Sequence, residues 1–133
     1  MTGSNFAFLA ADWPDLHAEA LRAEQAALTD PRTACFYARR TLELTVAWLF
    51  QAEGGRGGAL RLPYKADLAA FLAEPSLRQL VGPALLAKMD VIRKLGNHAV
   101  HQARPVAARE ATDALRELFH VAWDVAAAEK GGA

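Results

Sequence analysis

The chain has 133 residues, which is the size of one domain, and its 53% hydrophobic and 23% charged residues exclude a mainly disordered protein. Fifteen basic residues balance fifteen acidic ones, so no global field attracts nucleic acid or a membrane. We expect a cytoplasmic protein, because the single cysteine, Cys35, permits no internal disulfide and fits a reducing compartment. No apolar run approaches the ~20 residues of a membrane span, and the first residues do not resemble a signal peptide.

The composition favours helices. Thirty alanines and 18 leucines stand against one isoleucine and seven valines. Alanine and leucine lose little entropy in a helix, whereas β-branched residues lose more. We therefore expect one all-α domain over residues 1–133.

The first elements are an arm and a helix. Residues 1–11 are expected to form an extended arm whose apolar side chains attach it to the body of the domain. These side chains are Phe6, Phe8 and Leu9. Asp12 is an expected N-cap, with Pro14 near the start of a helix over 13–29.

The second helix is predicted over 31–53, after the start signal Asp30-Pro31. It is apolar nearly all round, which is typical of a central helix. A glycine-rich connector follows over 54–64, and it lacks the Gly-Lys-Ser/Thr of a phosphate-binding loop. Two short helices are expected over 65–73 and 76–80.

The last two main helices are predicted over 83–95 and 106–128, with Gly96-Asn97 interrupting or bending the chain between them. Residues 129–133 are expected to be a flexible tail. The sequence therefore predicts an antiparallel bundle of four main helices plus short ones.

Charge is uneven along the chain. Residues 54–105 carry eight basic and three acidic groups, a net charge of +5, so the middle of the chain is modestly basic. Two interpretations are open: an ordinary solvated surface, or a surface that contacts phosphates.

One cluster of polar residues has chemical content. If the chain is helical there, Arg93, Asn97 and His101 lie at i, i+4 and i+8 on one face, and His98 points about 100° away from Asn97. Arg39 or Arg40 of the second helix is expected to join them. Guanidinium forks and an imidazole are groups that grip or cleave a phosphodiester.

A structural role for the same residues is the alternative. Asn97 can end a helix, and a buried His101 can form a hydrogen bond to a neighbouring helix. Arg93 can pair with Glu43 or Asp90. Neither a metal nor a cofactor is expected, because no cysteine or carboxylate completes the pair His98-x-x-His101. Cys35, inside an apolar helix, reads as inert packing.

Five segments together resemble a known family, over about 4–127. They are SNFAFLAADWPDL, TDPRTACFYARRTLELTVAWLF, LRLPYKADLAAFLAEPSLRQLVGP, IRKLGNHAVHQARPV and DALRELFHVAWDVA, of which FYARRTLE and LGNHAVH are the most specific. The chain resembles the helical domain at the front of type I restriction endonuclease R-subunit (HsdR-like) proteins, which is similar to the HEPN superfamily of helical bundles. The resemblance implies a prokaryotic context of DNA restriction and antiphage defence, with nuclease and helicase domains elsewhere in the polypeptide.

Many HEPN proteins are metal-independent RNases, whose motif is an arginine, a polar residue, three further residues and a histidine. Asn97 and His101 match the polar residue and the histidine, but the arginine position falls on Gly96. Arg93 and His98 have an acceptable spacing for a substitute pair, but they lie on the wrong face of the helix. The resemblance therefore implies a catalytically silent relative.

We expect a non-catalytic accessory domain of a type I restriction R subunit, in contact with another subunit, a neighbouring domain or nucleic acid. One alternative is a HEPN-type RNase acting as a homodimer, with Arg93, His98 and His101 as its catalytic candidates. A second is a nucleic-acid-binding module, in which the basic residues named below share one face, and a third is a pure interaction or dimerisation module. The residues expected to contact nucleic acid or a ligand are Arg39, Arg40, Arg93, Lys94, Asn97, His101 and Arg104.

Overall fold

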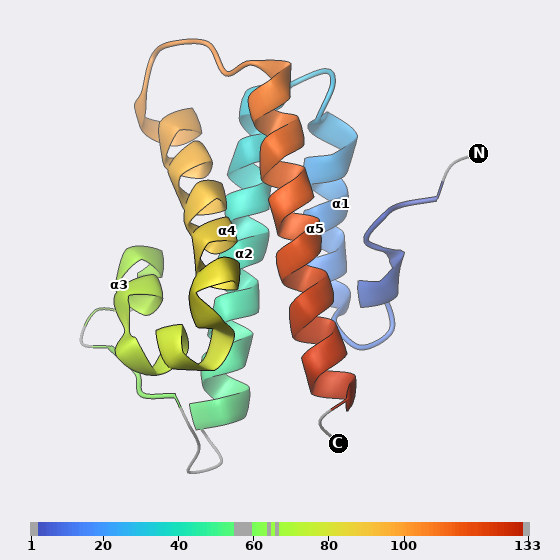
Figure 1. Cartoon of the computed structure of the whole chain (residues 1–133). Coiled ribbons are helices and arrows are strands. Elements are labelled where there is room, and N and C mark those ends of the chain that lie inside the picture. The colour runs from blue at the N-terminus through green and yellow to red at the C-terminus, as the bar shows by residue number, and fades with distance from the viewer. Residues whose placement is uncertain (1–2, 55–59, 64, 66, 132–133) are drawn as a thin grey trace.

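All the regular secondary structure in the described part of the chain is helical, and the helices form a bundle. A computed structural model describes residues 3–54, 60–63, 65 and 67–131. Its elements are a 3-10 turn η1 (Ala7–Leu9) and the helices α1 (Pro14–Ala26), α2 (Pro31–Gly54), α3 (Leu68–Ala73), α4 (Pro75–His101) and α5 (Ala108–Gly131). The four long helices α1, α2, α4 and α5 run alternately up and down (Figure 1). The predicted all-α antiparallel bundle is confirmed.

Helix α2 is the central element, as its apolar sequence predicts. It contacts α1, α3, α4 and α5. Its predicted inward stripe is buried, and consists of Ala34, Ala38, Leu42, Val46 and Leu49. Thr41 and Thr45 are buried too, and each hydroxyl donates to the backbone carbonyl four residues earlier, at 2.8 Å. Their polar groups are therefore satisfied inside the core.

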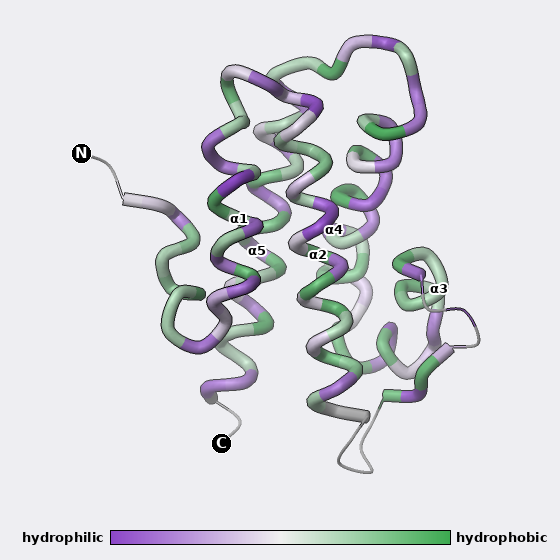
Figure 2. Tube along the Cα trace, turned by 180° about the vertical axis from the view of Figure 1, so that it is seen from behind, coloured by the Kyte–Doolittle hydropathy of each residue, from purple (hydrophilic) through white to green (hydrophobic). Residues whose placement is uncertain are grey.

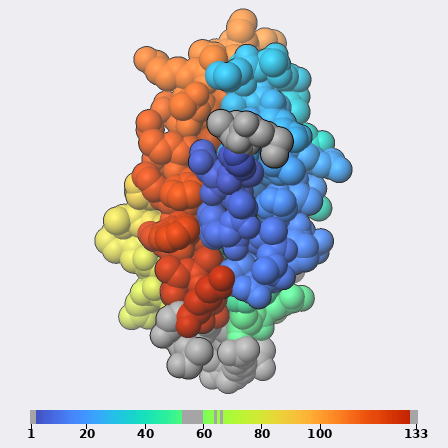
Figure 3. All heavy atoms as spheres, turned by 90° about the vertical axis from the view of Figure 1, so that its right-hand side faces the viewer, coloured from blue at the N-terminus to red at the C-terminus, as the bar shows by residue number. Residues whose placement is uncertain are grey.

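Residues 3–11 of the N-terminal arm lie between α1 and α5, as Figure 3 shows. They are not extended as expected, because the arm contains the 3-10 turn η1. Phe6 and Leu9 are buried, and the Phe8 ring lies 5.8 Å from the Phe119 ring and 5.0 Å from the Trp123 ring. The expected attachment of the arm through its apolar side chains is confirmed.

The two expected helix starts behave differently. Asp30 caps α2, because its Oδ1 accepts from the Thr33 backbone N–H at 3.3 Å. Asp12 is not a cap, so that expectation is wrong. Trp13 holds the N-cap position of α1 without a side-chain hydrogen bond, while Asp12 lies 3.4 Å from Lys130.

Helix α4 differs most from the prediction. Gly96 and Asn97 do not interrupt the chain; they lie inside a helix that continues to His101. A break does fall at Gly82, between the short helix expected over 76–80 and the helix expected from Pro83, so this boundary is confirmed. Its φ of 83° and ψ of 165° divide α4 into 75–81 and 83–101. This backbone conformation is essentially restricted to glycine.

The ends of the other elements shift by a few residues. α3 begins at Leu68, after Asp67 accepts from the Ala70 backbone N–H at 2.8 Å, so 65 and 67 precede the helix. α5 continues through 129–131 of the expected tail. The other tail residues and most of the expected connector over 54–64 lie outside the described residues.

None of the helices described here is long and apolar enough to cross a membrane. Figure 2 shows hydrophilic and hydrophobic residues interleaved along α1, α2 and α5, the pattern of helices with one buried side.

Candidate functional site

The contact between α2 and α4 decides what the site can hold. Gly96 is buried against Arg39 of α2. A Cβ added at Gly96 would lie 2.4 Å from the Cβ, 2.6 Å from the Cδ and 3.0 Å from the Cγ of Arg39. Glycine therefore allows the two helices to approach closely here, and the position has no room for any side chain.

Arg39 itself is held in this contact. Its Nη1 lies 3.3 Å from Glu43 Oε1 on the next turn of α2. Its Nε is buried without a hydrogen-bond partner in the described part of the chain. The guanidinium is thus directed along α2, and its aliphatic stem covers Gly96.

Arg93 is committed to a neighbour on its own helix. Its Nε and Nη2 both donate to Asp90 Oδ1, at 3.0 and 2.8 Å, while Lys94 Nζ lies 3.0 Å from Oδ2. Partial burial raises the pKa of Asp90, but hydrogen bonds and charge from Lys94 and Arg93 outweigh it, so the pKa is lowered overall. Of the two partners expected for Arg93, the structure selects Asp90 and not Glu43.

The two histidines of the cluster lie in different environments. His98 is buried, with 6% of its surface exposed, and its Nδ1 lies 2.7 Å from Gln102 Oε1. An amide oxygen only accepts, so Nδ1 carries the hydrogen in this bond. His98 Nε2 is buried without a partner among the described residues. His101 is exposed, which contradicts the expected buried hydrogen bond.

The continuous helix keeps Arg93, Asn97 and His101 along one side of α4, but no hydrogen bond joins them in the described structure. Asn97 is half-buried in the helix interior, so its expected role at a helix end is wrong. The three residues therefore share a surface without forming a connected acid–base set.

Most of the expected basic contact residues already have carboxylate partners. Besides Arg39, Arg93 and Lys94, Arg104 lies 3.4 Å from Glu110. Arg40 is exposed and has no ion pair in the part of the chain that the structure describes. Four of the five basic residues expected to contact a ligand are thus paired with a carboxylate.

Arg32 is the important residue that sequence reasoning missed. Its guanidinium donates to three backbone carbonyls at the end of α4: that of Ala99, that of Gln102 at 3.1 Å and that of Arg104 at 2.6 Å. These carbonyls have no partner within the helix, and a cation suits the negative end of the helix dipole. The sequence contains no signal for these contacts of Arg32, whose partners lie 67 to 72 residues further along the chain.

The connection between α4 and α5 is fixed from the other side by Glu110. Its Oε1 accepts from the Ala107 backbone N–H at 3.0 Å. This bond lowers the pKa of Glu110, burial opposes it, and Arg104 and His98 lower the pKa further. The connection over 102–107 is therefore held to the first turn of α5 at its far end, while Gln102 at its near end lies beside His98.

Cys35 is buried in α2, as expected of a packing residue. Burial, and then the charge of Glu110, raise the pKa of its thiol to about 11. A thiol with so high a pKa is not a nucleophile near neutral pH. No group of three or more histidine, cysteine or acidic residues suited to a metal ion occurs in the described residues.

A comparison with protein families gives one match, to a domain of unknown function (DUF4145), over residues 21–130. The chain belongs to the DUF4145 family. The match covers the second half of α1, all of α2, α3 and α4, and α5 except its last residue, and it leaves out the N-terminal arm. No curated protein and no solved structure matches the chain.

Proposed function

We propose that this DUF4145 domain is a non-catalytic accessory domain of a type I restriction R subunit, and that it docks on other domains or subunits of that complex. The observation that most supports a non-catalytic domain is the contact of Gly96 with Arg39. Cleavage of a phosphodiester without metal needs a cation at the developing phosphorane charge. The position that would supply it holds a glycine whose space is filled by a neighbouring side chain.

The substitute groups do not compensate for that glycine. Arg93 is bonded to Asp90, His98 is buried beside Gln102, and His101 is exposed without a hydrogen-bond partner among the described residues. A general acid or base also needs an orienting partner and a nearby charge stabiliser. This arrangement argues against the RNase alternative.

Contact with protein is favoured over contact with nucleic acid. Nucleic-acid affinity comes largely from lysines and arginines that neutralise phosphates. Here Arg39, Arg93, Lys94 and Arg104 each have a carboxylate within 3.4 Å, and the whole chain has no net charge. The context of DNA restriction and phage defence rests on the resemblance of the five segments quoted above.

Two measurements on the purified chain test the non-catalytic part. We expect no cleavage of single-stranded RNA in the presence of EDTA, and only weak RNA or DNA binding without a steep dependence on salt. RNA cleavage that His101→Ala abolishes would establish the RNase alternative and overturn the proposal. Binding whose logarithm falls steeply with the logarithm of salt concentration would establish a nucleic-acid module instead.

The restriction context is tested in the native host. We expect that deleting the coding region for residues 1–133 raises the plating efficiency of unmodified phage, while the nuclease and helicase parts are still produced. The matched control is His101→Ala in the intact gene, which should restrict like the wild type. Unchanged plating after the deletion would contradict a role in restriction.

A further inference from the structure

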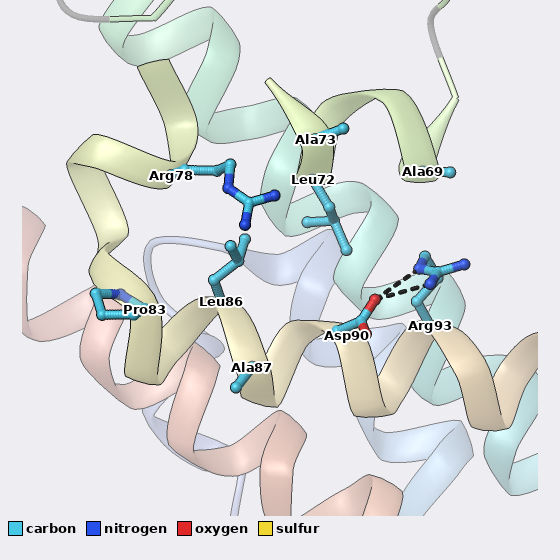
Figure 4. A pocket seen from close by; sticks show the side chains of 9 residues that line it. All are labelled: Ala69, Leu72, Ala73, Arg78, Pro83, Leu86, Ala87, Asp90 and Arg93. Atoms are coloured by element: carbon cyan, nitrogen blue, oxygen red, sulfur yellow. Dashed lines mark hydrogen bonds and ion pairs between the residues drawn. The ribbon is translucent and has the colours of Figure 1, made fainter. Parts of the chain in front are cut away.

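A pocket lies between α3 and α4, away from the α2–α4 contact. Its volume is about 450 Å³, within the range of small-molecule sites. Figure 4 shows its walls: Leu72 and two alanines from α3, and Pro83, Leu86 and Ala87 from α4. The guanidinium groups of Arg78 and Arg93 and the carboxylate of Asp90 complete the lining.

The kink at Gly82 creates this pocket. The segment 75–81 carries Arg78, and the segment 83–101 carries Leu86 and Asp90; Gly82 sets the angle between the two segments. In Figure 4 the guanidinium of Arg78 points in towards Leu86 and Leu72, while Arg93 and Asp90 lie together at the opposite end. A straight helix would not bring Arg78 over this apolar floor.

The two guanidiniums differ in availability. Arg93 uses two of its nitrogens on Asp90. Arg78 has no ion pair or hydrogen bond in the described residues. Its natural helical partner, Glu74 at i−4, is occupied elsewhere, since its Oε2 accepts from the Ser76 backbone N–H at 2.6 Å and from the Ser76 hydroxyl at the start of α4. Arg78 therefore keeps its donors for a ligand.

The charges around the pocket select the ligand. Arg78 and Arg93 contribute two positive charges and Asp90 one negative charge, so the lining has a net charge of +1. A monoanion neutralises that charge, whereas a dianionic phosphate would leave one negative charge uncompensated in a pocket that already contains Asp90. The aliphatic walls favour an apolar body attached to the anion.

We propose that this pocket binds an aliphatic monocarboxylate, with Arg78 pairing with the carboxylate and Leu72 and Leu86 contacting the alkyl group. Guanidinium and carboxylate match in geometry and form charge-assisted hydrogen bonds. Two sources share this chemistry: a free aliphatic acid, and the terminal carboxylate of a protein chain that ends in an aliphatic residue. The inference does not depend on the proposed restriction context.

The test is titration of the purified chain with octanoate, followed by calorimetry and by ¹H–¹⁵N NMR shifts. We expect shifts confined to α3 and to residues 75–93 of α4, with little binding of neutral octanol and weaker binding of octyl phosphate. Arg78→Gln should weaken octanoate binding about fivefold or more. The matched control is Arg109→Gln, which removes the same charge from an exposed position on α5.

A second arm separates the two sources. A pentapeptide ending in leucine is titrated as the free acid and as the amide. Binding of the free acid but not of the amide supports a protein terminus as the ligand, whereas binding of octanoate alone supports a small acid. The proposal is overturned if neither compound binds, if Arg78→Gln binds like the wild type, or if octyl phosphate binds more tightly than octanoate. Thermal melting checks that both variants remain folded.

Discussion

Replacing Gly96 by alanine tests whether close packing is the reason for this glycine. The new Cβ would lie 2.4 Å from Arg39 Cβ, well inside van der Waals contact. The Cγ and Cδ of Arg39 can rotate away, but its Cβ is fixed to the backbone of α2, so the helices must separate. Overpacking of this kind costs about 1–3 kcal/mol. An alanine inside a helix recovers about 0.5–1 kcal/mol relative to glycine.

We therefore expect Gly96→Ala to lower the free energy of unfolding by roughly 1–2 kcal/mol, measured by urea denaturation followed by circular dichroism. Partner variants identify the atom responsible. Arg39→Ala removes the contacts at 2.6 and 3.0 Å but leaves the Cβ at 2.4 Å, so it should rescue Gly96→Ala only partly. Arg39→Gly removes all three contacts and should rescue it more fully, when each double variant is compared with its own single variants.

The reasoning is refuted if Gly96→Ala is as stable as the wild type or more stable. It is refuted also if Arg39→Ala and Arg39→Gly show the same coupling energy with Gly96→Ala. In that case the glycine would be an ordinary helix residue, and the steric argument for a silent site would lose its basis.

Three further outcomes follow from the structure. Gly82→Ala should lower the free energy of unfolding by about 1–3 kcal/mol in urea denaturation, because an alanine is strained at a φ of 83°; unchanged stability would contradict this backbone. Arg32→Ala should lower the free energy of unfolding by about 1–3 kcal/mol and should accelerate hydrogen exchange of the backbone amides of 99–104 before the rest. Uniform acceleration along the chain would show that Arg32 does not stabilise this segment locally. Folding raises the pKa of Cys35 from 9.0 to about 11, so unfolding releases a proton between these pH values. As the pH rises through this window, the free energy of unfolding of the wild type should therefore fall by roughly 2 kcal/mol more than that of Cys35→Ala. Parallel pH profiles of the two proteins would exclude this linkage.

The hydrophobic pattern was sufficient for the bundle and for its central helix. Period and composition placed α1, α2 and α5 within a few residues of their observed ends. The error in α4 has a physical cause: a glycine needed for close approach and a glycine needed for positive φ look alike in a sequence. Gly96 serves the first purpose and Gly82 the second. They are distinguished only in the folded chain, by the Arg39 side chain packed on Gly96 and by the positive φ of Gly82.

The candidate site was predictable only along one helix. Spacing correctly placed Arg93, Asn97 and His101 on one side of α4. The partner of the buried His98 is instead Gln102, just after the end of α4, and the carbonyls of Gln102 and Arg104 are held by Arg32 from a helix distant in sequence. Helical periodicity carries no information about contacts of this kind.

The contact at Gly96 also bears on whether catalysis could be restored by one change. Gly96→Arg would supply the missing guanidinium, yet its Cβ would meet the same Arg39 atoms as that of an alanine. The incoming side chain would have to displace α2 before it could reach a phosphate. A cation at this position therefore requires a matching change at Arg39, so the loss of the motif is built into the packing of α2 against α4 and is not a single exchanged residue on an otherwise competent site.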